Sequence, residues 1–234
     1  MVSTSITHTR ATVPAIARFG FDRLLPAALF GAIALARLRS VAHLWVAPVD
    51  ATFEGWLMHV LALGHACLTL AFLGLLSVLF LARRTPVGSR AAPLAMVIAL
   101  AGTFVMWLAL AQPPTTDDWR VLAIADVVMI AGLVFTLYAL GALRACFGLA
   151  PEARGLVTTG AYRLVRHPIY LGEFVIFLGA LLPVLAPMTI VIFGLFCLLQ
   201  ARRAALEEAA LSAAFPDYAA YRRRTPALLP WARS

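Results

Sequence analysis

The sequence contains no lysine, few charged residues and few cysteines. Its 19 basic residues are all arginine, and charged residues make up only 13% of the 234 residues, against 62% hydrophobic residues. A globule of this size needs more polar side chains than that to cover its surface in water. The composition therefore excludes an ordinary water-soluble domain and predicts a protein that is dissolved in lipid.

The scarcity of cysteine also limits the possible chemistry. Cys67, Cys146 and Cys197 lie in or beside apolar segments without CxxC-type spacing, which indicates neither a disulfide framework nor a thiolate metal site. His59 and His65 are six residues apart and so fall on different faces of a helix, an arrangement that does not suit paired ligation. We therefore expect no metal.

Long apolar runs dominate the chain. Four of them, residues 24–45, 56–82, 91–112 and 121–143, can each cross a hydrocarbon core of about 30 Å as one helix. The run at 169–201 is too long for one crossing, and Pro183 and Pro187 each remove a helix hydrogen bond near its middle. The sequence therefore predicts an all-α, polytopic protein with about six membrane segments, the last two forming a Pro-broken helical hairpin.

The arginines predict the orientation of these segments, because arginine accumulates in cytoplasmic loops. With both termini cytoplasmic, the outer loops hold only Arg120 among the arginines, together with the acids Asp50, Glu54, Asp117 and Asp118. We therefore predict cytoplasmic termini, no cleaved signal peptide and an integral, multi-pass protein, placed in a bacterial inner membrane. Because the arginines lie between apolar runs, we expect them to contact membrane lipids and not nucleic acid.

Polar groups suited to chemistry are concentrated in two blocks on either side of the predicted hairpin. In the first block His167 precedes Pro168, which can take the first position of a helix whose amino end attracts electron-rich groups. In the second block Arg203 and Glu207 are four residues apart on one helix face, beside Glu208. Because a hairpin returns the chain to the side it left, the two blocks are expected to form one cytoplasmic site.

These blocks resemble two signatures of the isoprenylcysteine carboxyl methyltransferase family, part of a superfamily that also contains phospholipid methyltransferases. The first signature is G-x-Y-x-x-x-R-H-P-x-Y, and the matching residues are Gly160, Tyr162, Arg166, His167, Pro168 and Tyr170. The second, which closes the family's sequences, is matched at Arg203, Glu207, Glu208, Leu211, Phe215, Tyr218, Tyr221 and Pro226. The resemblance covers residues 140–231.

The resemblance implies methyl transfer from S-adenosyl-L-methionine, without a metal, to an isoprenoid or other lipid-like carboxylate that enters from the bilayer. By matched position, the implied cofactor-binding residues are Gly160, Tyr162, Arg166, His167, Pro168, Ile169, Tyr170 and Glu207. Arg203 would engage the acceptor. A carboxylate acceptor needs no base, whereas an amine or hydroxyl acceptor would need one, and Glu208 or Glu173 is available for it. The chain then divides into a four-span membrane region at 1–143 and a methyltransferase-like catalytic region at 144–234.

The sequence leaves several alternatives open. The acceptor can instead be a phospholipid or another hydrophobic N- or O-nucleophile, and a non-catalytic carrier or scaffold would keep the same fold. Glu173 can contact the cofactor or acceptor, or it can be a buried partner of Arg166. Asp126 lies near the outer end of its span, where we expect it to pair with Arg37 or Arg39.

Overall fold

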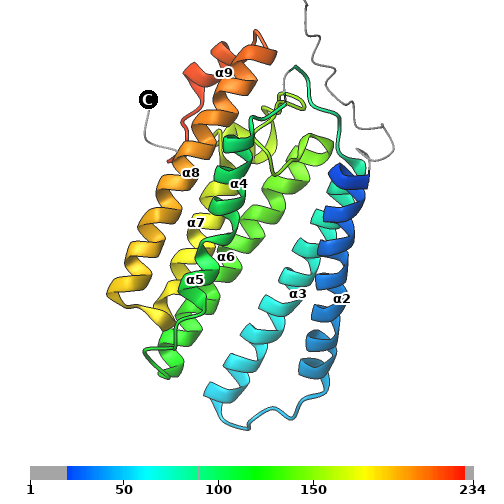
Figure 1. The fold of residues 1–234 in the computed structure, drawn as a ribbon. Coiled ribbons are helices and arrows are strands. Elements are labelled where there is room, and N and C mark those ends of the chain that lie inside the picture. Colours follow the sequence, from blue (N-terminus) through cyan, green and yellow to red (C-terminus); the bar gives the residue numbers. More distant parts are fainter. Residues whose placement is uncertain (1–19, 89, 230–234) are drawn as a thin grey trace, which may run out of the picture.

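A computed structural model describes residues 20–88 and 90–229, and all regular elements within these ranges are helical (Figure 1). After the π-helical turn η1 (Gly20–Leu24), the main helices are α2 (Leu25–Val46), α3 (Phe53–Ala82), α4 (Pro93–Phe104), α5 (Met106–Leu110), α6 (Trp119–Leu143), α7 (Pro168–Leu181), α8 (Pro187–Ala214) and α9 (Tyr218–Arg224). Helices α4 and α5 follow one another as a single span. Short 3-10 turns lie at η2 (Arg144–Cys146), η3 (Gly160–Arg163) and η4 (Leu182–Val184).

Among the described residues, five helical stretches are long and apolar enough to cross a membrane, and residues Pro168–Val184 form a shorter apolar stretch. The predicted all-α membrane fold is confirmed, and the chain is an integral membrane protein. The helices run alternately up and down in Figure 1, so α3, α6 and α8 end where α4 and α7 begin. Both termini fall outside the described residues, so their cytoplasmic location stays a prediction.

Local sequence signals set where several helices begin. Pro93, Pro168 and Pro187 occupy the first turns of α4, α7 and α8, where a missing N–H removes no helix hydrogen bond. The side chain of Asp118 caps α6 by accepting from the Arg120 N–H at 2.9 Å, and Thr52 caps α3 in the same way.

The long apolar run is broken near Pro183, as predicted, and becomes α7 and α8. The two helices diverge from the turn: α7 packs along α6, whereas α8 packs on α4 and α5. Aromatic side chains span the space between them, with Phe174 and Phe193 at 5.3 Å and Phe177 and Phe196 at 5.0 Å between ring centroids. The two helices are therefore farther apart at the end that is predicted to face the cytoplasm, and the polar residues lie there.

Glycine allows α6 and α7 to approach closely. A Cβ atom at Gly132 would lie 2.7 Å from the Ile176 backbone nitrogen, and one at Gly179 would lie 2.8 Å from the Ala125 carbonyl oxygen. A Cβ atom at Gly172 would meet Thr136, which itself bonds back to the Gly132 carbonyl at 2.8 Å. Small residues at such contacts let the backbones of membrane helices approach closely. The α6–α7 pair is therefore tightly packed.

Candidate functional site

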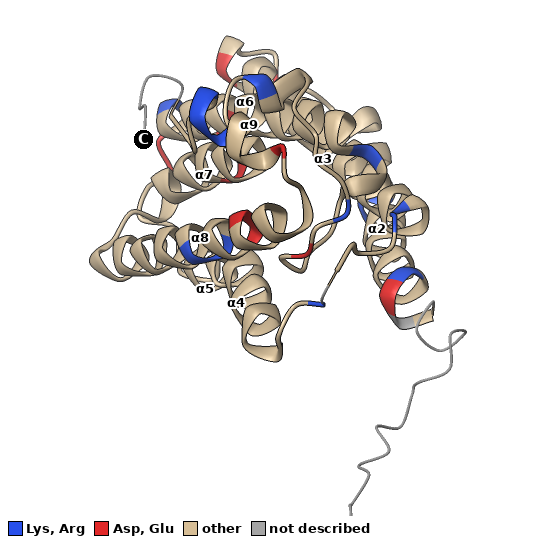
Figure 2. Ribbon diagram, turned by 90° about the horizontal axis from the view of Figure 1, so that it is seen from above, with Lys and Arg blue, Asp and Glu red and all other residues tan. Residues whose placement is uncertain are grey.

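The two polar blocks meet at one end of the bundle, as predicted. The Arg166 and His167 backbone N–H groups donate to the carbonyl oxygens of Pro226 and Ala227 at 2.8 and 3.1 Å, so the segment after α9 lies alongside the start of α7. Gly160, with φ of +61°, makes the turn that leads into this segment, and a Cβ there would crowd Ala142. Figure 2, viewed from this end, shows arginine and acidic residues gathered around it.

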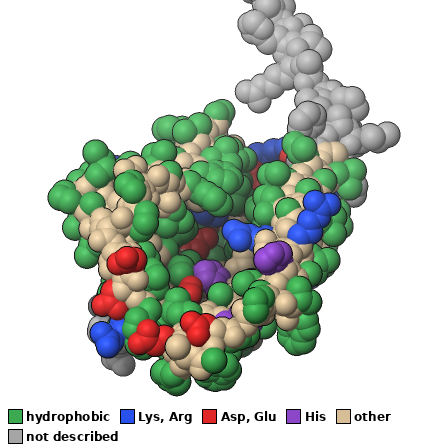
Figure 3. Space-filling model, turned by 90° about the horizontal axis from the view of Figure 1, so that it is seen from below, with side chains coloured by type: hydrophobic (Ala, Val, Ile, Leu, Met, Phe, Trp, Pro, Cys, Tyr) green, Lys and Arg blue, Asp and Glu red, His purple; other side chains and the backbone are tan. Residues whose placement is uncertain are grey.

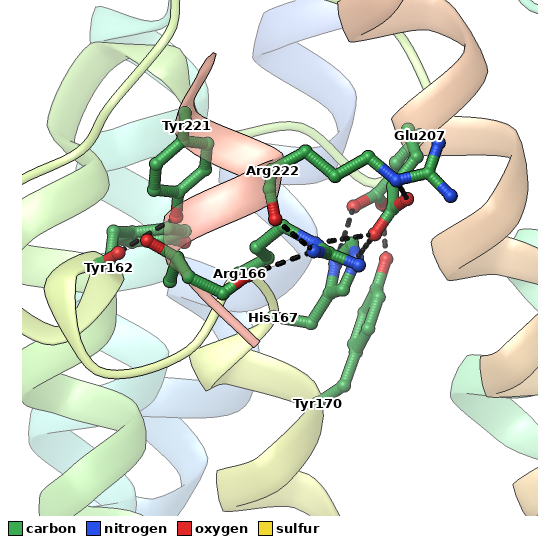
Figure 4. A network of polar contacts seen from close by, with 9 residues as sticks. Tyr162, Arg166, His167, Tyr170, Glu207, Tyr221 and Arg222 are labelled. Atoms are coloured by element: carbon green, nitrogen blue, oxygen red, sulfur yellow. Dashed lines mark hydrogen bonds and ion pairs between the residues drawn. The ribbon is translucent and has the colours of Figure 1, made fainter. Parts of the chain in front are cut away.

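Arg166 is the centre of a buried network that holds these segments together (Figure 4). Its Nε donates to Glu208 at 2.9 Å, and one terminal nitrogen donates to the carbonyl oxygens of Arg222 and Thr225 at 2.9 and 2.8 Å. Its partner is thus Glu208, and the alternative that Arg166 pairs with Glu173 is wrong. One guanidinium joins the start of α7 to both α8 and α9.

Glu208 is held on several sides at once. Besides Arg166, the His167 Nε2 atom lies 3.0 Å from its carboxylate and the Arg222 Nε atom 3.6 Å from it. Its carboxylate is not among the groups that line the adjoining cavity. The sequence offered Glu208 as one of two candidate bases, but this geometry favours a positioning role for it.

Glu207, the neighbouring residue on α8, does face the cavity. It accepts a hydrogen bond from the Tyr170 hydroxyl and lies 3.5 Å from the Arg203 Nε atom. The rings of His167 and Tyr170 stack, with centroids 5.4 Å apart and planes at 12°. The predicted pair of Arg203 and Glu207 therefore exists, and it forms part of a larger cluster with α7.

Arg203 is buried, with 5% of its surface exposed. Its guanidinium donates to the Leu149 carbonyl at 3.0 Å and to the Thr103 hydroxyl on α4 at 3.4 Å, and it lies 5.0 Å over the Tyr170 ring. One helical turn closer to the membrane centre, Gln200 donates a hydrogen bond to Glu173. These contacts place a cation and two carboxylates on the same cavity wall.

Tyr162 and Tyr221 hold two segments of the site together. The Tyr221 hydroxyl donates to the Tyr162 carbonyl at 2.8 Å, which ties α9 to η3. Burial raises the pKa of Tyr221 to about 12 and also raises that of Tyr162, so both phenols stay neutral. Tyr162, predicted to contact the cofactor, lines the cavity, and its backbone carbonyl accepts the hydrogen bond from Tyr221.

A cavity of about 420 Å³ extends from this polar cluster into the membrane part of the bundle. Of the predicted site residues, its lining includes Tyr162, Arg166, His167, Ile169, Tyr170, Arg203 and Glu207, whereas Gly160, Pro168 and Glu208 are not part of it. Apolar side chains such as Phe72, Leu76 and Leu133 form its middle. The volume and the mostly apolar lining are typical of a small-molecule site.

Sequence reasoning missed single contributions from α4, from α8 and from the loop before η3. Thr103, Leu149 and Gln200 contact the cluster, but each sits in an ordinary apolar or loop context with no local pattern that marks it. At the far end of the cavity, Asp126 lies 2.9 Å from His65 on α3, so the expectation that Arg37 or Arg39 pairs with Asp126 is wrong.

Comparisons with known proteins point to a family of membrane methyltransferases. Residues 120–217 match the family model described as phospholipid methyltransferase, which confirms the resemblance to membrane methyltransferases of this kind. The match includes α6, and the predicted boundary between a span region and a catalytic region at 143 stays a prediction.

Two bacterial relatives are metal resistance proteins by name. The chain is 42% identical over 77 residues to the cobalt-zinc-cadmium resistance protein CzcN of Cupriavidus metallidurans, covering 32% of this chain and 35% of that protein. It is 33% identical over 116 residues to the nickel-cobalt-cadmium resistance protein NccN of Alcaligenes xylosoxydans xylosoxydans, covering 49% and 53%. The chain thus spans about half or less of the length of these relatives.

Proposed function

We propose that this integral membrane protein, whose residues 120–217 match the phospholipid methyltransferase family, transfers a methyl group from S-adenosyl-L-methionine to a lipid-like carboxylate. One observation carries the proposal: the cluster of Tyr170, Arg203 and Glu207 sits at the polar end of a cavity whose remaining length is apolar. A charged, soluble cofactor and an apolar acceptor could meet only where such surfaces adjoin.

The charges at the polar end fit the cofactor. Two other guanidinium groups line this end of the cavity, but that of Arg166 is paired with Glu208 and that of Arg154 with Glu152. Only the guanidinium of Arg203 is left beside Glu207 and Glu173, so the Glu207 carboxylate favours a cationic ligand. The cofactor supplies a methyl group on a positively charged sulfonium. His167, Tyr170 and Glu207 would hold it: the stacked rings offer a flat aromatic surface, and the carboxylate offers a counter-charge.

The acceptor would enter with its apolar part in the middle of the cavity. Arg203 is buried and its position is fixed by Leu149 and Thr103, so it can orient a carboxylate without moving. Orientation of two reactants accounts for up to about 7–11 kcal/mol of a reaction barrier in well-aligned systems. Lipid and apolar side chains exclude water, which strengthens the electrostatic interactions within the site.

A phospholipid amine is the second candidate acceptor, favoured by the description of the matching family. A protonated amine needs a base before it can accept a methyl group. Glu173 and Glu207 line the cavity and could take the proton, whereas Glu208 is turned toward Arg166 and His167. The two candidates therefore differ in their need for a base: a carboxylate acceptor needs none, whereas an amine acceptor needs Glu173 or Glu207.

A methylation screen tests the proposal. Purified protein, radiolabelled S-adenosyl-L-methionine and a bacterial lipid extract should yield a labelled lipid, and base-labile label would identify a methyl ester. Arg203→Ala should reduce the yield of this product, whereas Arg202→Ala, a change at the exposed neighbour, should not. A base-stable, amine-linked product that needs Glu173 would favour the second candidate. Absence of product, together with no binding of S-adenosylhomocysteine, would favour a carrier or scaffold.

A further inference from the structure

The far end of the cavity carries a second polar cluster, outside the residues that match the family. Arg37 on α2 and His65 and Thr69 on α3 line it. Figure 3, which views the bundle from the end opposite α9, shows basic, acidic and histidine side chains inside a hollow rimmed by apolar ones. These groups lie well inside their helices, where a bilayer would surround them.

Arg37 makes no ion pair or hydrogen bond with any other residue in the described ranges. It is 12 residues from the start of α2 at Leu25, or roughly 18 Å at 1.5 Å per residue, so it lies near the membrane centre. An arginine at that depth is costly unless it reaches a partner or a polar cavity. Because Arg37 lines the cavity, a bound ligand can supply the missing partner.

Asp126 does not serve as that partner, because it is engaged elsewhere. Its carboxylate lies 2.9 Å from the His65 Nδ1 atom, which fixes the imidazole and leaves its Nε2 atom for another group. The guanidinium of Arg37 and the imidazole of His65 therefore offer hydrogen-bonding nitrogens to the same space.

The two polar ends are separated by a length of apolar wall. Along α6 the lining runs from Met129 to Leu143, roughly 21 Å of helix rise. The cavity is also open to lipid, because its lining residues Ile33, Phe104 and Trp107 are 40 to 63% exposed. These belong to α2, α4 and α5, and α2 packs on α3 and not closely on α4 or α5. A long, thin lipid could therefore enter sideways between them.

We propose that the methyl acceptor is an elongated lipid with a polar group at both ends. One end reacts beside Arg203, and the other, an anion, binds Arg37 with support from His65. This inference rests on the proposed methyltransferase function for the identity of the reacting end. The far-end site itself depends only on Arg37, His65 and the cavity between the two clusters.

Binding of model lipids tests this directly. Hexadecanedioic acid carries a carboxylate at each end, and hexadecanoic acid at one. We expect the wild-type protein in detergent to bind the diacid about tenfold or more tightly relative to the monoacid, as one charged hydrogen bond predicts. Arg37→Leu and Arg37→Gln should lose this preference. Arg39→Leu, two residues along the same helix and not part of the cavity lining, should keep it. Comparing variants in the same micelles cancels differences in probe partitioning.

The outcomes separate the two proposals. Binding of S-adenosylhomocysteine without any diacid preference overturns the far-end site and leaves the methyltransferase proposal standing. A diacid preference that needs Arg37, but with no binding of S-adenosylhomocysteine, supports the far-end site and removes the methyltransferase proposal. Equal loss of the diacid preference in Arg37→Gln and Arg39→Leu would mean that the preference depends on the total charge of α2 and not on a site at Arg37. That result would also overturn the far-end site.

Discussion

The two ends of the cavity are built differently. At the α9 end, Arg166 and Glu208 each have several partners, drawn from α7, α8 and the segment around α9. At the far end, His65 and Asp126 form one pair and Arg37 has no partner within the described ranges. A network whose charges are paired within the protein is rigid before a ligand binds, whereas an unpaired charge can form its ion pair with a ligand. We infer that the α9 end positions the chemistry and the far end selects the lipid.

The largest effect is expected where the α9 end depends on one side chain. Arg166→Leu should destabilise the protein by about 3–5 kcal/mol, because it leaves Glu208 and two carbonyl groups without their donor in a buried place. Thermal unfolding in detergent would measure the loss, and limited proteolysis should cut the chain after Ala214. Arg163→Leu is the control, since Arg163 is exposed. Equal stability of the two variants would show that the network does not fix this end.

The packing beneath that network should be the next most sensitive feature. Gly172→Ala places a Cβ against Thr136 and 3.1 Å from the Gly132 carbonyl oxygen, and overpacking of this kind costs about 1–3 kcal/mol. Gly141→Ala, on α6, adds a Cβ that has nothing within 4 Å and should be neutral. Thermal unfolding would compare them. A Gly172→Ala protein as stable as wild type would mean that α6 and α7 can separate, and that their contact does not hold the site.

A smaller effect on the kinetics should differ between variants of Arg203 and Glu207. Arg203→Ala should weaken the acceptor or slow transfer, and Glu207→Gln should raise the KM for the cofactor about tenfold, because each removes a charge that faces a different ligand. Steady-state kinetics with each substrate varied would measure both. Equal and slight effects of the two changes would mean that neither side chain binds the ligand assigned to it.

The smallest effect is expected for Arg222, which shares Glu208 with Arg166. Its side chain is 60% exposed and lies 3.6 Å from the carboxylate, so Arg222→Ala should cost well under about 1 kcal/mol. The backbone carbonyl that Arg166 uses remains in this variant. If Arg222→Ala lost as much stability as Arg166→Leu, the burial of Arg166 would not explain its larger expected contribution to the free energy of unfolding.

The sequence predicted the parts of the fold that depend on local patterns. Apolar runs gave the spans, Pro183 and Pro187 gave the break in the hairpin, and helix spacing gave the pair of Arg203 and Glu207. These signals act within a few residues of one another, so they can be read without knowing the fold.

The sequence could not predict partners that only packing brings together. Asp126 was matched to an arginine by charge, yet the packing of α3 on α6 presents His65 to it. Glu207 and Glu208 are adjacent and chemically alike, and only the direction of α8 decides which one faces the cavity. The contact of Arg203 with Thr103 joins residues 100 positions apart. Such choices depend on how whole helices cross.

Glu207 and its neighbours are proposed to form the cofactor site, and calorimetry with S-adenosylhomocysteine tests this most directly. We predict that the wild-type protein in detergent binds the compound at a single site. Glu207→Gln should bind about tenfold or more weakly, and Glu54→Gln, on α3 at the opposite end of the bundle, should bind as wild type does. Absence of binding to the wild-type protein, or equal binding to Glu207→Gln, would contradict the account.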